Sequence, residues 1–189
     1  MGIFAVTQAV TAVRRRALKL TPTACLIGCT ISAVTWWAAY PGWAQTMGDE
    51  AELERLRVKA EDAMASDDPE GAAMAMGRAA MMAKRLSVVH RNDGTSARLY
   101  QGAEALFRSQ EHGYRAMALF RRAGGQLPAS SGVCGSLALA QGSVHHAVSD
   151  LAAGDAAPEP LKERVTRWRE TADDWVTVLA AMITDYQCP

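Results

Sequence analysis

Helical periodicity constrains the fold of this chain more than any other feature of its sequence, because it runs almost without interruption from Glu50 to Tyr186. Apolar residues recur there at spacings of three and four, as on one face of a helix, whereas the alternating, β-branched pattern of half-buried strands does not occur. We therefore expect an all-α domain.

Turn-forming residues divide this region into seven expected helices. Asp68 can cap a helix whose first position is Pro69, and Ser96 can cap the helix that follows the loop at 91–96. Gly124 and Gly125 end another helix. Short connections predict that neighbouring helices form antiparallel hairpins. The expected helices span residues 48–66, 69–88, 96–110, 113–124, 131–141, 143–153 and 159–187.

Residues 1–44 differ from the rest of the chain and are interpreted as an export signal. A basic cluster at 14–19 precedes an apolar run at 24–40, and the small residues Gly42 and Ala44 follow. This order is typical of a signal peptide, and we expect cleavage after Ala44 and a periplasmic domain over residues 45–189. The alternative is a retained membrane anchor, because the apolar run is just long enough to span a bilayer.

Charge argues against nucleic acid as a partner. The 189 residues hold 20 Lys and Arg and 20 Asp and Glu, but the segment 1–44 contains basic residues and no acidic one. The mature chain is therefore mildly acidic and lacks the basic surface that phosphate binding requires. Its length allows one domain with one hydrophobic core.

Two cysteines, Cys134 and Cys188, remain after the presequence is removed. An even pair in an exported protein predicts a disulfide. The bond would close a loop of about 55 residues, for which the chain-entropy model gives roughly 4 kcal/mol of stabilisation. It would fix the C-terminal end to the body of the domain.

A pattern of small and aromatic residues runs through the window from Ala97 to Ser130. It consists of Tyr100, Ala103 and Phe107 on a first helix, Ala116, Phe120 and Ala123 on a second, and a closing Pro128. This pattern resembles a tetratricopeptide repeat, a hairpin of two helices, although Ala103 stands where Leu is usual and Glu104 where a small residue is usual. Weaker copies of the pattern occur at 56–79 and 134–151.

This resemblance implies a short solenoid of stacked hairpins that binds another exported or envelope protein as an adaptor or assembly factor. In that family the first helix of each pair lines a groove that grips the partner. The positions of this chain that correspond to the groove are Arg57, Glu61, Arg98, Gln101 and Arg108.

The final expected helix has the most regular apolar stripe of the chain, with the charged residues lying between its members. We interpret it as a closing helix that covers the last hairpin. The alternative is the seam of a homodimer. The stripe consists of Leu161, Val165, Trp168, Ala172, Trp175, Leu179, Met182 and Tyr186.

The second functional interpretation is a periplasmic carrier of a metal or small ligand on a helical bundle. Thioethers can bind Cu(I), and the first hairpin is rich in methionine. His145 and His146 are adjacent, which points them about 100° apart on a helix and disfavours a shared metal. The sequence contains no nucleotide-binding loop, zinc-protease helix or serine-nucleophile motif, so we predict neither catalysis nor a bound cofactor. The methionines are Met64, Met74, Met76, Met81 and Met82.

Overall fold

The structure is a computed structural model that describes residues 41–189, and this part of the chain is all-helical, as predicted. Most of the interpreted export signal, residues 1–40, lies outside the described residues. The elements are α1 (Pro41–Ala65), α2 (Pro69–Val89), α3 (Gly94–Arg122), α4 (Ser131–Leu151), a short 3₁₀ helix η1 (Ala152–Ala156) and α5 (Glu159–Asp185).

The prediction of seven helices is wrong, because two pairs of expected helices are each one continuous helix. Residues 96–110 and 113–124 both belong to α3, and residues 131–141 and 143–153 belong mainly to α4. The expected two-helix unit between Ala97 and Ser130 is therefore not formed. In addition, α1 begins at Pro41 rather than at residue 48.

Helix α3 continues through Gly113, a position at which it packs closely against α5. A Cβ atom at this position would lie 2.7 Å from Cζ2 of Trp175 on α5. The missing side chain lets α5 approach α3 closely, at a cost in helix propensity of about 1 kcal/mol relative to Ala. This glycine is thus a packing position within a helix and not a helix end.

The helix ends follow ordinary capping chemistry. Asp68 caps α2 by accepting a hydrogen bond from the Gly71 amide, and Pro69 takes the first turn, as predicted. The cap of α3 is Asp93 and not Ser96; the Ser96 amide and hydroxyl both donate to the Asp93 carboxylate. Gly124 and Gly125 follow α3 with positive φ angles of 72° and 69°, a conformation that glycine adopts without strain.

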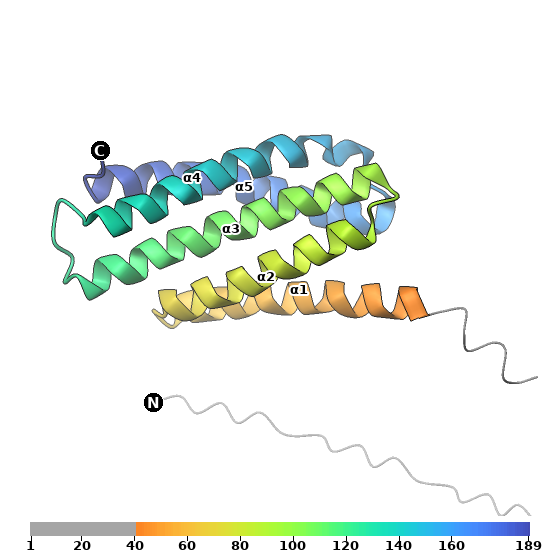
Figure 1. Ribbon diagram of the computed structural model, residues 1–189, viewed down its shortest axis with the longest axis horizontal. Helices are drawn as coiled ribbons and strands as arrows, with labels where there is room; N and C mark the ends of the chain where they lie inside the picture. The colour runs from red at the N-terminus through yellow and green to blue at the C-terminus, as the bar shows by residue number, and fades with distance from the viewer. Residues whose placement is uncertain (1–40) are drawn as a thin grey trace, which may run out of the picture. The chain divides into compact units, whose positions relative to one another are not determined.

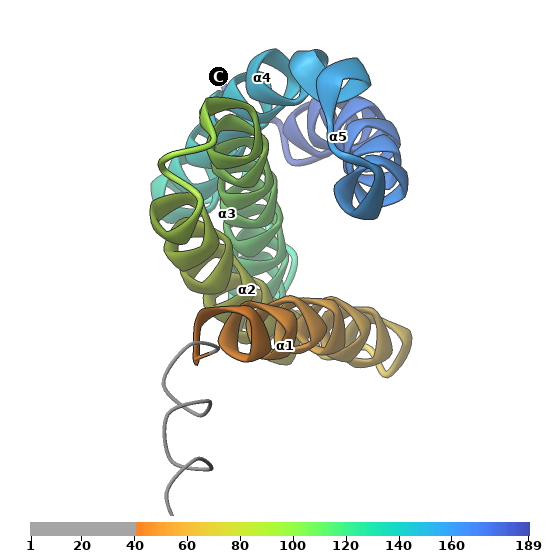
Figure 2. The same cartoon turned by 90° about the vertical axis from the view of Figure 1, so that its right-hand side faces the viewer.

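Consecutive helices lie side by side, with α3 between α2 and α4 (Figure 1). Helix α5 folds back against α4 and α3, as the second view shows (Figure 2). Small residues permit the close approach of α2 and α3: Ala79 and Ala83 of α2 and Ala103 of α3 are fully buried. Close packing of this kind is what gives an alanine-rich helix a stable place in a core.

The core is completed by aromatic side chains between α3 and α5. The ring of Trp168 on α5 lies 6.0 Å from that of Tyr100 and 6.2 Å from that of Phe107, both in edge-to-face geometry. All three are almost completely buried. Further along the same interface, Trp175 meets Tyr114 at 5.3 Å. Such pairs add about 0.5–1.5 kcal/mol each beyond the burial of their surface.

The apolar stripe of α5 packs against other helices of the same chain. Leu161, Val165, Ala172 and Leu179, like Trp168, are buried against the rest of the domain. These five positions therefore lie against the chain's own core.

Charged side chains join α1 to α5. Arg164 Nη1 lies 3.3 Å from Glu50 Oε2, and Arg167 Nη1 lies 4.0 Å from Glu54 Oε1.

The Tyr100 hydroxyl donates to Glu50 Oε1 at 2.5 Å. Burial, followed by this contact with Glu50, raises the pKa of Tyr100. The hydroxyl of this otherwise apolar residue therefore has a partner.

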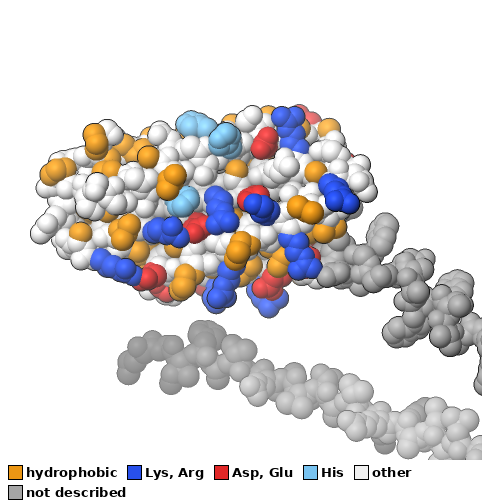
Figure 3. Space-filling view, viewed as in Figure 1, with side chains coloured by type: hydrophobic (Ala, Val, Ile, Leu, Met, Phe, Trp, Pro, Cys, Tyr) orange, Lys and Arg blue, Asp and Glu red, His pale blue; other side chains and the backbone are white. Residues whose placement is uncertain are grey.

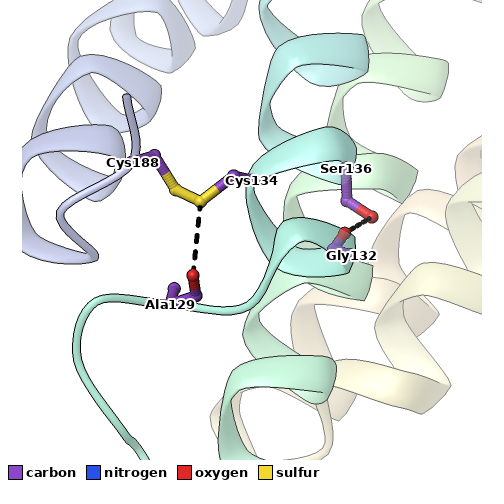
Figure 4. Close-up of a disulfide and its surroundings, with 5 residues drawn as sticks. All are labelled: Ala129, Gly132, Cys134, Ser136 and Cys188. Atoms are coloured by element: carbon purple, nitrogen blue, oxygen red, sulfur yellow. Dashed lines mark hydrogen bonds between the residues drawn. A yellow bond between two sulfur atoms is a disulfide. The ribbon is translucent and has the colours of Figure 1, made fainter.

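The predicted disulfide between Cys134 and Cys188 is present, with a Cα–Cα distance of 5.4 Å (Figure 4). It ties the residues after α5 to the first turn of α4. The Cys134 sulfur also lies 3.9 Å from the carbonyl oxygen of Ala129, and the Ala129 amide donates to the Tyr186 carbonyl at 2.9 Å. The C-terminal end is therefore attached covalently to α4 and by a hydrogen bond to the α3–α4 loop.

None of the helices within residues 41–189 has a stretch that is both long enough and apolar enough to cross a membrane.

Candidate functional site

A groove of about 510 Å³ lies between α2 and α3 and is here called the α2–α3 groove. Figure 3 shows the face on which these helices lie, where hydrophobic, basic and acidic side chains are close neighbours. The groove is lined by Glu70, Ala73, Met74, Gly77, Arg78 and Met81 from α2 and by Arg108, Glu111, Arg115, Ala118, Leu119 and Arg122 from α3.

One side of the groove is an exposed apolar row on α2. Met74 and Met81 are 62% and 57% exposed, although their neighbours Ala75 and Ala80 are buried. Val88, seven residues further on, is also exposed. Residues seven apart share one helix face, so α2 has an apolar stripe on the side opposite to its buried alanines.

The other side of the groove is a row of arginines on α3. Arg108, Arg115 and Arg122 are also spaced by seven residues and therefore follow one face of the helix. The guanidinium group can donate up to five N–H bonds in a fixed, planar arrangement. A row of these groups suits the recognition of several carboxylates.

Glu111 holds two of these arginines in place. Its carboxylate accepts a hydrogen bond from Arg108 Nη1 at 2.8 Å and one from Arg115 Nη2 at 2.6 Å. The Glu111 side chain is only 10% exposed, whereas both arginines remain more accessible. Gly77 on α2 leaves room for this carboxylate, since a Cβ there would lie 3.1 Å from it. One buried anion thus fixes two cations whose other donors remain available.

Basic groups outnumber acidic ones in the groove. Arg122 pairs with Glu70, which leaves the second glutamate, Glu111, shared between two arginines. Arg78 on α2 is exposed and forms no ion pair within residues 41–189. Four arginines therefore face two glutamates, and the groove carries a positive excess beside an apolar row.

The five residues predicted to bind a partner are divided between α1 and α3. Arg57 and Glu61 pair with each other on α1, and Arg98 pairs with Asp150 of α4 at 3.4 Å. Gln101 is exposed on α3, seven residues before Arg108 and therefore on the same face of the helix. Arg108 is the one member of the set that lines the α2–α3 groove. A role for the other four in binding stays a prediction.

A smaller cleft of about 230 Å³ lies between α1 and α5. Its arginines are engaged: Arg57 donates to Glu54, and Arg164 pairs with Glu50. The hydrogen bond from Arg57 lowers the pKa of Glu54 against the opposing effect of burial. These groups are mutually neutralised, so the cleft offers a ligand less free charge than the α2–α3 groove does.

The residues considered for metal binding are dispersed. Met76 is buried in the core, whereas Met74 and Met81 are exposed on another face of α2. His145 and His146 are both exposed on α4. Within residues 41–189, no three His, Cys, Asp or Glu side chains lie close enough together to hold a metal ion.

The sequence analysis found Arg108 and the methionines but missed Arg78, Glu111, Arg115 and Arg122. The seven-residue spacing of the three α3 arginines was a readable signal. It was hidden because an expected break at 111–112 placed Arg108 and Arg115 on different helices.

No protein-family model, curated protein or solved structure matches this chain.

Proposed function

We propose that this chain is an exported protein-binding module, an adaptor or assembly factor, that holds an acidic segment of another protein in the α2–α3 groove. The observation that carries the proposal is the pairing of an exposed methionine row with an arginine row across one concave surface. Methionine side chains adapt to partners of varied shape, and arginines supply directed bonds to carboxylates.

Export is part of this proposal. The basic-then-apolar order of residues 14–40 supports it, and the disulfide between Cys134 and Cys188 is of the kind that persists in oxidising compartments. The mass of the chain isolated from the cells that produce it tests this point. A chain that starts at Gln45 is expected, whereas a membrane-bound chain that retains residues 1–44 would favour the anchor alternative.

The relation to tetratricopeptide repeats is likewise a proposal. With α3 and α4 each continuous, the repeating unit would consist of the longer pairs α1 with α2 and α3 with α4, closed by α5. The packing of each helix on its neighbours in the chain supports this solenoid-like arrangement.

Site-specific photocrosslinking tests the binding function. A photoreactive residue is placed at position 81 of the full chain in its own cells, and the matched control carries it at position 58, because Val58 is exposed on α1 away from the groove. We expect a discrete adduct from position 81 alone, with the crosslink in an acidic segment of the partner. No adduct from position 81, or equal adducts from both positions, would contradict the proposal.

A further inference from the structure

The two rows of the α2–α3 groove are in register with each other. Contacts between Glu70 and Arg122 and between Lys84 and Glu104 show that α2 and α3 run antiparallel. In this register Met81 lies at the level of Arg108, and Met74 lies at the level of Arg115. The groove therefore repeats a unit of one methionine and one arginine.

The length of this repeat selects the conformation of a partner. Seven residues of α-helix rise about 10.5 Å, at 1.5 Å per residue. A second helix lying along the groove repeats one of its own faces over the same distance. A strand covers that distance in about three residues, at roughly 3.3 Å each, and an odd number of steps turns the side chain to the opposite face. A strand that satisfies one arginine thus directs its next matching residue away from the groove.

The charges and the shape of the groove select the chemistry of the partner. The excess of arginine favours carboxylates, and the exposed Met74 and Met81 favour apolar side chains. An anionic membrane would meet the same arginines, but the surface is concave and also contains Glu70 and Glu111. Those two carboxylates would repel lipid phosphates, so a protein segment fits better than a bilayer.

We propose that the α2–α3 groove binds an amphipathic, acidic α-helix of a partner protein. Apolar side chains of this helix pack on Met74 and Met81, and carboxylates seven residues apart meet Arg108 and Arg115. From Arg108 to Arg122 the groove is about 21 Å long, which corresponds to a helix of about four turns. The inference rests on the proposed function, because it specifies the segment that the groove holds.

Two fluorescein-labelled peptides of 21 residues test the inference by fluorescence anisotropy with the full chain. The first has leucine and glutamate at heptad spacing, and the second has the same charge but carries two prolines at its centre, which break the helix. We expect the helical peptide to bind at least about tenfold more tightly, because the broken peptide cannot match the repeat. Equal binding of both peptides would overturn the helix inference and leave the proposed function standing. Failure of both to bind would contradict both.

A matched pair of charge reversals tests the location. Arg78 lines the groove and Lys59 is exposed on α1; each is free of ion pairs within residues 41–189, so neither reversal removes a stabilising contact. We expect Arg78→Glu to weaken binding of the helical peptide about tenfold, through lost complementarity, and Lys59→Glu to leave it unchanged. Equal effects of the two variants would contradict the assignment to the groove. Binding to phosphatidylglycerol vesicles that Arg78→Glu abolishes, without peptide binding, would identify a membrane surface instead and overturn the proposal.

Discussion

Helix α3 carries two rows of side chains with the same seven-residue spacing, displaced by one residue, and the two rows have opposite environments. Tyr100, Phe107 and Tyr114 face the interior, where Trp168 and Trp175 of α5 pack against them. Arg108 and Arg115 face the groove, where no helix of the described chain covers them. The aromatic row stabilises the fold, whereas the arginine row is kept in place at the surface by the buried Glu111.

This difference shows that spacing alone does not assign a role to a helix face. The aromatic row gains about 25 cal/mol for each Å² of surface removed from water, and it is buried against α5 of its own chain. A row of arginines gains nothing comparable from burial, because desolvation of the charge opposes it. Side chains that stay accessible and ordered are available for an external ligand.

Truncation of Trp168 is the change expected to affect the aromatic row most. Trp168→Ala removes a ring that contacts Tyr100 and Phe107 in the core, and we expect the free energy of unfolding to fall by about 3–5 kcal/mol. Urea denaturation followed by circular dichroism measures this. Met81→Ala is the control in the groove, and its exposure predicts a change within about 0.5 kcal/mol. Similar losses for both variants would remove the distinction between the two rows.

The disulfide attaches the C-terminal end of α5 to α4 and so helps to keep α5 packed against the aromatic row of α3. Replacement of both Cys134 and Cys188 by serine is expected to lower the free energy of unfolding by about 2–4 kcal/mol. Without the bond the unfolded chain is no longer held in a large closed loop, so its conformational entropy rises and unfolding becomes more favourable. Denaturation with and without reductant provides the measurement. The native chain should lose stability on reduction, and the serine variant should be insensitive to it. A native chain indifferent to reductant would show that α5 is held by packing alone.

Loss of the Glu111 charge should change the stability of the fold and the affinity of the groove for an acidic peptide in opposite directions. Glu111→Gln removes a carboxylate that bonds both Arg108 and Arg115, and we expect a loss of about 1–3 kcal/mol in the free energy of unfolding. The same change makes the groove more positive, so the affinity for the acidic helical peptide should rise. Glu61→Gln, on the exposed surface of α1, is the control for both measurements. A variant that is destabilised and also binds more weakly would mean that the ordering of Arg108 and Arg115 by Glu111 contributes more to binding than the removal of its negative charge.

The sequence was sufficient to predict the fold class, the α2 boundaries and the disulfide, because these depend on local signals such as the Asp68–Pro69 start and the even cysteine pair. It was insufficient at Gly113, whose role depends on the distant Trp175. The expected break at 111–112 divided α3 and concealed the arginine row. The burial of Glu111 beside Gly77 could not be predicted from the sequence either, because it depends on the packing of α2 against α3.

The smallest expected effect concerns His112, which follows Glu111 on α3. Its Nδ1 atom is buried without a hydrogen-bond partner, and burial lowers the pKa of the ring, against the raising effect of Glu111. The folded state therefore disfavours the protonated ring more than the unfolded state does. The contribution of His112 to the free energy of unfolding is therefore complete above the pKa of about 6.5 that histidine has in the unfolded chain, and it is lost as the pH falls below that value.

We therefore expect the midpoint temperature of unfolding to fall between pH 7.5 and pH 5.5, and His112→Gln to reduce that fall. His145→Gln is the matched control, because His145 is exposed on α4 and its replacement should leave the pH dependence unchanged. A His112→Gln variant with the full native decrease would show that water reaches the ring. The boundary between the buried and accessible sides of α3 would then lie closer to the core than this histidine.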